Sequence, residues 1–149
     1  MIQLIKHWRE VFGLPNRIAP QIPNNDELEL ASRLIFEEAD ELYEAIQGKS
    51  LNDIADAVGD LYFVVTQMAM VCGLDPEKLV QKVYFSNMSK LCKTEDEAIQ
   101  SVTFYLQKGI KTYIEQKDEY FIIKRSEDGK VLKSINFKEP EWNYHEQIS

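Results

Sequence analysis

Apolar residues recur at helical spacing through the first part of the chain. In a first helix, predicted over residues 2–12, they are Ile2, Ile5, Trp8 and Phe12. Gly13 and Pro15 end this helix, and the proline-rich residues 14–25 predict an extended connector. A longer helix is predicted over residues 26–47, with Gly48 as its C-terminal cap. The inner stripe of this second helix is predicted to comprise Leu30, Ala31, Leu34, Leu42, Ala45 and Ile46.

Three further helices are predicted over residues 51–72, 76–91 and 95–108. Each follows a residue that favours a helix N-terminus, because its side-chain oxygen can accept a hydrogen bond from a free backbone N–H. These caps are Ser50, Asp75 followed by Pro76, and Thr94 with Glu97 three residues later. The turn at residues 48–50 is short, which favours an antiparallel arrangement of the second and third helices.

The pattern changes after residue 110. Residues 111–138 are rich in β-prone side chains and predict a small hairpin, for which Asp128-Gly129 is the turn signal. From Glu139 the chain is predicted to form a surface arm. We therefore predict an all-α fold, a bundle of four to five helices over residues 1–110. Residues 111–149 add a C-terminal β-hairpin and arm to the same domain.

Composition narrows the classes of function. A length of 149 residues suits one domain. The net charge of −8 argues against a nucleic-acid partner, because an acidic chain repels phosphate backbones. No uncharged apolar stretch reaches the roughly 18 residues of a membrane span, so no membrane partner is expected. The two cysteines, Cys72 and Cys92, have neither metal-site spacing nor a disulfide framework, which suggests a cytoplasmic location.

Two groups of carboxylates stand on consecutive helices. Glu37, Glu38 and Glu41 share one face of the second helix, where an exposed acidic surface is the usual explanation. Asp53, Asp56 and Asp60 occupy one narrow arc of the third helix.

Asp60 is the most informative of these residues. It is the only charge between Ala57 and Cys72, on a helix that is apolar nearly all round, so we expect it to be buried. A buried carboxylate needs a cation, a metal ion or a proton, and an ion pair or a tyrosine hydroxyl would also satisfy it. Carboxylates that face each other from two helices repel unless cations neutralise them, and ligands that are all oxygen suit Mg²⁺ or Mn²⁺ better than zinc.

At this point the residues resemble a known family. Residues 34–42 and 56–62 resemble the all-α nucleoside triphosphate pyrophosphohydrolases, which include MazG, the dimeric dUTPases and phosphoribosyl-ATP pyrophosphohydrolase. The family pattern is ExxE, a spacer and then ExxD on two helices. Residues 86–90 and 128–133, together with His7 and Phe12-Gly13, resemble segments of some small members.

The resemblance implies magnesium-dependent cleavage between the α and β phosphates, with Mn²⁺ as a possible substitute. Glu38 and Glu41 match the two glutamates of ExxE, and Asp60 matches the aspartate of ExxD. The glutamate of ExxD falls on Ala57, so Asp56, or else Asp53, would supply the missing metal ligand. Glu37 matches the position that holds or activates the attacking water.

The resemblance also implies substrate contacts and an assembly. Asn87 and Lys90 would contact phosphates, and Trp8 and Phe12 would stack on the base, although aromatic residues at helical spacing are more often core. A homodimer or homotetramer is expected. The open alternative is a non-catalytic helical oligomer, an adaptor or nucleotide sensor, since Ala57 departs from the pattern. A di-iron bundle and a P-loop NTPase are excluded, because Glu-x-x-His pairs and the glycine-rich loop are missing.

Overall fold

The computed structural model describes residues 2–144, which form two compact units. Of the described residues, the first unit contains 2–79 and 143–144, and the second contains Val80–Trp142. The division between these compact units falls within a helix. The predicted single domain, with helices over residues 1–110 and the hairpin and arm over 111–149, stays a prediction. Residues 145–149 of the predicted arm, including His145, lie outside the described residues.

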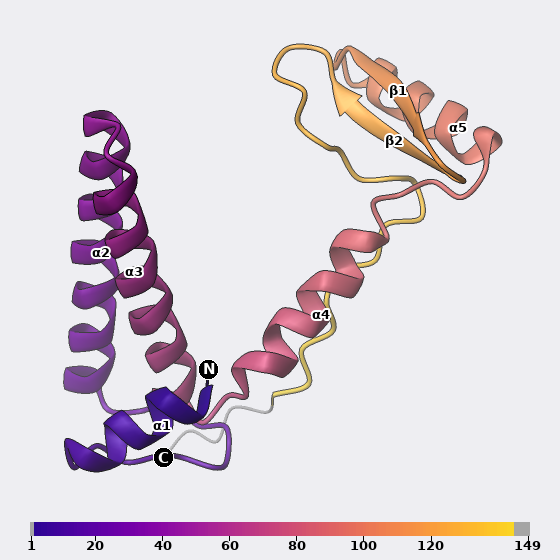
Figure 1. Cartoon of the computed structure of the whole chain (residues 1–149). Coiled ribbons are helices and arrows are strands. Elements are labelled where there is room, and N and C mark those ends of the chain that lie inside the picture. Colours follow the sequence, from indigo (N-terminus) through magenta and orange to yellow (C-terminus); the bar gives the residue numbers. More distant parts are fainter. Residues whose placement is uncertain (1, 145–149) are drawn as a thin grey trace. The chain divides into compact units, whose positions relative to one another are not determined.

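The first unit is built on a pair of long helices. α2 (Asn25–Gly48) and α3 (Leu51–Val71) pack along each other as an antiparallel hairpin. α1 (Ile2–Val11) packs against α3 and lies across one end of the pair (Figure 1). This arrangement confirms the antiparallel neighbours predicted from the short turn.

Side-chain caps fix where these helices begin. Asn24 caps α2 by accepting a hydrogen bond from the Glu27 backbone N–H at 2.9 Å. Ser50 caps α3 as predicted, and its hydroxyl accepts from the Asp53 N–H at 3.3 Å. At the end of α2 the left-handed residue is Lys49, with φ 55°, and not the predicted cap Gly48.

Gly73 holds the connector against the end of α3. Its φ is +67°, and a Cβ at this position would lie 2.0 Å from the carbonyl oxygen of Ala19. The Gln21 N–H also donates to the Cys72 carbonyl at 3.0 Å. Only glycine allows this approach, so the connector reaches the start of α2 along a fixed path.

Several apolar side chains of this unit remain exposed. Ala31 and Ala45 of the predicted inner stripe are buried, but Leu30 is 48% exposed and Ile46 is 50% exposed, so this part of the prediction was wrong. The reason is that α2 is covered along one side only. On α3, exposed apolar residues follow one another at helical spacing, namely Val58, Tyr62 and Val65.

Among the helices of residues 2–144, α3 is the one that is long and apolar enough to cross a membrane by length and composition alone. Its most apolar 18-residue window has a mean hydropathy of 1.3 and is 33% buried. A core helix passes the same test, and the prediction of no membrane partner stays a prediction.

The second unit surrounds a small core. α4 (Pro76–Met88) runs across the division, and α5 (Glu95–Gln107) packs on a hairpin of β1 (Thr112–Lys117) and β2 (Tyr120–Arg125). Cys92, Ala98 and Ile123 are fully buried between α5 and the hairpin. Thr94 caps α5 as predicted, with its hydroxyl 3.2 Å from the Glu97 nitrogen.

The turn of the hairpin differs from the predicted one. Lys117 pairs with Tyr120, so the turn is Asp118-Glu119, and Asp118 adopts a φ of 52°. Asp128-Gly129 instead forms a turn after β2. This turn brings Val131 back to pair with Lys124 in an isolated antiparallel bridge. The prediction failed because the actual turn lacks the glycine that usually marks such turns. The predicted fold class is confirmed, with five helices and a small antiparallel hairpin in the described residues.

Candidate functional site

The candidate site lies on the α2–α3 hairpin. Glu38 is half-buried there, and its pKa is raised above the ordinary value. Partial loss of solvent contact is the largest cause, because it disfavours the charged form. Other negative charges add to the rise, in the order Glu41, Asp60, Glu37 and Asp56.

The origin of these charges is informative. Glu41 and Glu37 lie on the same helix as Glu38, but Asp60 and Asp56 come from α3. The packing of α2 on α3 therefore brings acidic groups of both helices within electrostatic range of Glu38. Asp53, the second proposed substitute for the missing glutamate, is not among the described groups that act on Glu38.

The expected burial of Asp60 was wrong. Asp60 is exposed in the single chain, although it interacts with Glu38. A helix that is apolar all round needs cover on every side, and within the first unit α3 has only α1 and α2 to cover it. Ala57, which occupies the position of the missing glutamate, is buried at 5% exposure.

Glu37 lies at the edge of this cluster. Its carboxylate is 3.7 Å from the Arg33 guanidinium, four residues earlier on α2, which agrees with the i,i+4 spacing. Both side chains are more than half exposed, so the pair contributes little to stability and leaves Glu37 open to water.

The donors of the cluster suit a hard divalent cation. Five carboxylates and no histidine or cysteine form the set, and such oxygen ligands favour Mg²⁺ or Mn²⁺. A cation would also offset the mutual repulsion that raises the pKa of Glu38. As placed, no three carboxylate, histidine or cysteine side chains of residues 2–144 surround a common point that could hold a metal ion. The ligands would therefore have to turn toward one another when a cation binds.

The two predicted base-stacking residues lie together. Trp8 and Phe12 stack with ring centroids 4.5 Å apart, and Trp8 meets Phe63 of α3 edge-on at 5.4 Å. Trp8 is half-buried and Phe12 is 63% exposed. Trp8 is therefore largely a packing residue that retains an accessible part.

Asn87 and Lys90 belong to the second unit, where Lys90 donates its N–H to the Asn87 carbonyl at 3.1 Å. Neighbouring serines have a clear structural role. Ser86 donates its hydroxyl to the Lys138 carbonyl at 2.8 Å, and the Ser89 hydroxyl accepts from the Lys138 N–H at 2.8 Å. This segment thus anchors the chain after the hairpin, and the predicted phosphate contacts of Asn87 and Lys90 stay predictions.

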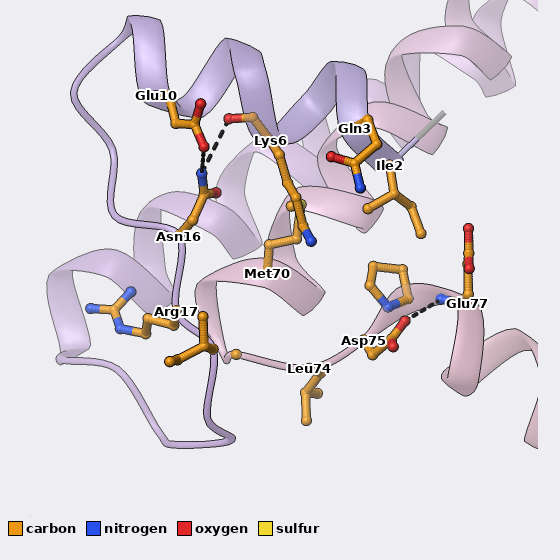
Figure 2. A pocket seen from close by; sticks show the side chains of 13 residues that line it. Ile2, Gln3, Lys6, Glu10, Asn16, Arg17, Met70, Leu74, Asp75 and Glu77 are labelled. Carbon is orange, nitrogen blue, oxygen red and sulfur yellow. Dashed lines mark hydrogen bonds between the residues drawn. The ribbon is translucent and has the colours of Figure 1, made fainter.

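A cavity of about 510 Å³ lies between α1 and the C-terminal end of α3 (Figure 2). Its polar side chains are partly occupied with each other, since Asn16 donates to the Glu10 carboxylate and to the Lys6 carbonyl, both at 3.2 Å. None of the candidate carboxylates lines it.

A second, smaller cavity contains residues that the sequence reasoning missed. Arg9 is only 2% exposed, and it donates to the Gln67 side chain at 3.3 Å. The signal was present in the sequence, because Arg9 follows Trp8 on a helix with an apolar face and Gln67 interrupts the apolar run of α3.

The chain is similar to one known protein family and to a viral protein. The family described as phosphoribosyl-ATP pyrophosphohydrolase matches residues 5–87, which is more than half of the chain. The matched segment includes every carboxylate of the candidate site, and it ends before α5 and the hairpin. An uncharacterised protein of Acanthamoeba polyphaga mimivirus is 27% identical over an alignment of 105 residues, which covers 66% of this chain. The chain spans 42% of that viral protein.

Proposed function

Because the chain belongs to the phosphoribosyl-ATP pyrophosphohydrolase family, we propose that it hydrolyses a nucleoside triphosphate, or a related nucleotide, between the α and β phosphates. Membership of this family supports a pyrophosphohydrolase activity on a nucleotide-like substrate. The products are the monophosphate and pyrophosphate. The observation that carries the proposal is the packing of α2 on α3, which brings acidic groups of both helices within electrostatic range of Glu38.

Glu38, Glu41, Asp60 and Asp56 are the residues that would hold Mg²⁺. The ion supplies positive charge beside the phosphate oxygens, which an acidic chain otherwise repels. These four carboxylates would hold the ion, and Glu37, at the exposed edge of the cluster, would lie beside the attacking water.

Glu37 acts as the general base in this proposal. The water oxygen bonds to the α phosphorus, the bond from that phosphorus to the bridging oxygen breaks, and pyrophosphate leaves with the bonding electrons. The water proton passes to Glu37, whose exposed carboxylate has only a long contact with Arg33.

We also propose that the chain works as a homodimer or homotetramer in the cytoplasm. The stripe of Val58, Tyr62 and Val65 on α3 supports this, because each side chain is 44–49% exposed and apolar. The α2–α3 hairpin of a second copy of the chain would cover the stripe and would also remove Asp60 from bulk water.

The test is a pyrophosphate-release assay with a panel of nucleotides and Mg²⁺. Glu38→Ala and Asp60→Ala should each lower the rate at least about a hundredfold, while Glu44→Ala, on the same helix but not among the groups that act on Glu38, should keep it. Equal activity in all variants would refute the assignment.

A second candidate function rests on Ala57. Because the position of the missing glutamate is filled by a buried methyl group, the chain would hold fewer ions than its relatives and act as a nucleotide sensor or adaptor. Saturable Mg²⁺ binding without turnover of any nucleotide in the panel would favour this candidate.

A further inference from the structure

The β-hairpin of the second unit has one occupied edge and one open edge. On the β2 side, Phe121 exchanges two backbone hydrogen bonds with Cys92, both at 2.9 Å. Further along the same edge, the Leu132 N–H donates to the Ile123 carbonyl at 2.8 Å. The chain itself therefore supplies backbone partners along the outer edge of β2.

The outer edge of β1 has no such partners. Lys117 pairs with Tyr120 across a two-residue turn, so the odd-numbered residues of β1 bond to β2 and the even-numbered residues point their N–H and C=O groups outward. The bond from the Ser126 N–H to the Lys111 carbonyl, at 2.9 Å, agrees with this alternation. The outward-pointing residues are Thr112, Ile114 and Gln116. No residue within 2–144 forms a hydrogen bond with their outward backbone groups.

An open strand edge is a template for a further strand. Its free N–H and C=O groups can bond to an extended segment of another chain, and many proteins prevent this with a proline, a bulge or charged side chains. Residues 112–117 contain no proline and pair with β2 residue for residue, without a bulge. The central outward-pointing residue is the apolar Ile114, so the middle of this edge is not shielded by charge.

We propose that β1 pairs antiparallel with β1 of a second copy of the chain, about a two-fold axis at Ile114. In this register Thr112 opposes Gln116 of the second copy, and Ile114 opposes the same residue. Each such pair exchanges two backbone hydrogen bonds, so all the outward-pointing groups of the edge are used. The two hairpins then form one four-stranded sheet with a two-fold interface.

The side chains match in this register. Ile114 shares a face with its cross-strand partner Ile123, which is buried against α5, yet Ile114 is 38% exposed. The same residue of the second copy would cover it. On the other face Tyr113 opposes Glu115 of the second copy, and no like charges oppose each other within 112–116. This self-complementarity favours a second copy over an unrelated peptide.

The proposed interface is separate from the acidic site and from the α3 stripe. The family match ends at residue 87, before the hairpin begins, so this interface belongs to the part of the chain beyond the matched segment. It does not depend on the proposed hydrolysis. If the α3 stripe pairs two copies, the β1 edges would join two such pairs into the homotetramer.

The mass measured by light scattering tests the pairing. Ile114→Lys brings two lysines together at the axis, and it should halve the mass of the assembly. Gln116→Pro removes an outward N–H that bonds nothing in β2, and it should act in the same way. Val131→Lys is the matched control, because Val131 is 40% exposed but lies on the occupied side of β2, and its mass should match the parent's. Parental mass in Ile114→Lys, with an unchanged circular dichroism spectrum, would overturn the proposal.

Disulfide cross-linking tests the register without disrupting the edge. The Cα atoms of a non-hydrogen-bonded antiparallel pair lie about 4.5 Å apart, which a disulfide can span. In a Cys72→Ser background the remaining cysteine, Cys92, is buried. Chains with Tyr113→Cys and chains with Glu115→Cys are mixed and oxidised with glutathione disulfide. The mixture should cross-link at least about fivefold more than either chain alone, because the proposed register sets these two positions opposite each other. Equal cross-linking in all three samples, or none in the mixture, would refute the register.

This interface and the α3 stripe fail separately. A mass lowered by Val65→Glu but not by Ile114→Lys would leave the stripe standing and overturn the β1 interface. A mass lowered by Ile114→Lys but not by Val65→Glu would support the β1 interface and exclude the stripe. Pyrophosphate release in the parent chain bears on neither result, so the proposed function is tested independently.

Discussion

Replacing Glu38 by glutamine should stabilise the protein in the absence of divalent cations. The change keeps the shape of the side chain and removes one negative charge from a cluster of five. A like charge three or four residues away on a helix costs about 0.2–0.5 kcal/mol, and Glu38 has Glu41 and further charges on both helices near it. We expect a gain of roughly 1 kcal/mol in chelator, which for a chain of this size raises Tm by about 2–4 °C.

Magnesium should make the wild-type chain more stable than Glu38→Gln, the reverse of the order expected in chelator. A ligand at a hundred times its Kd stabilises the folded state by about 2.7 kcal/mol, so the wild-type chain should gain Tm by several degrees and Glu38→Gln should gain little. Thermal unfolding followed by circular dichroism, with and without Mg²⁺, measures both effects. Glu44→Gln is the control, because it removes a charge from the same helix at a residue that does not act on Glu38.

The pH dependence has a definite sign. The pKa of Glu38 in the folded state lies above its ordinary value of 4.5, so the unfolded chain releases this proton first as the pH rises. The wild-type protein in chelator should therefore lose stability as the pH climbs from about 4.5 through the raised pKa, and Glu38→Gln should lack this component. A Glu38→Gln variant less stable than wild type in chelator, or shifted no more than Glu44→Gln, would refute the reasoning.

The remaining predictions concern the fold and its assembly. Gly73→Ala should cost at least about 2 kcal/mol in denaturant unfolding, because a Cβ would lie 2.0 Å from the Ala19 oxygen, whereas Gly13→Ala, also at positive φ but with open space around it, should cost only about 1–2 kcal/mol. Ile123→Ala should destabilise the second unit by about 2–5 kcal/mol, since the side chain is fully buried; a loss below about 1 kcal/mol would contradict that core. Val65→Glu places a charge in the exposed apolar stripe of α3, so it should shift the mass measured by light scattering toward that of the monomer. An unchanged mass would exclude the stripe from the interface between copies of the chain.

Local signals in the sequence predicted the helices well. Ser50 and Thr94 cap the helices where their side chains indicated, because a cap is a contact between residues three apart and needs no tertiary information. The turn of the β-hairpin was misplaced because its position does depend on tertiary contacts. Asp118-Glu119 carries no glycine, and the pairing of β1 with β2 depends on the packing of Ile123 against Ala98 of α5.

The candidate site was predictable only in part. The spacing of Glu38 and Glu41 on one helix and of Asp56 and Asp60 on the next, with a short turn between them, was sufficient to anticipate that acidic groups of both helices come within electrostatic range of each other. Their role as metal ligands stays a prediction. The exposure of Asp60 was not predictable, because an apolar helix indicates that cover is needed but not which chain supplies it. The sequence marks Arg9 and Gln67 as polar residues on apolar helices, but it does not show the tertiary contact in which Arg17 takes the Glu27 carboxylate and leaves Arg9 without one.

Manganese binding followed by electron paramagnetic resonance tests the central claim most directly, because free Mn²⁺ gives a sharp signal that is lost on binding. The account predicts saturable loss of this signal with the wild-type chain, competition by Mg²⁺, and binding weakened at least about tenfold in both Glu38→Gln and Asp60→Asn, one variant from each helix. Wild-type affinity retained in either variant would contradict a cation site shared between α2 and α3.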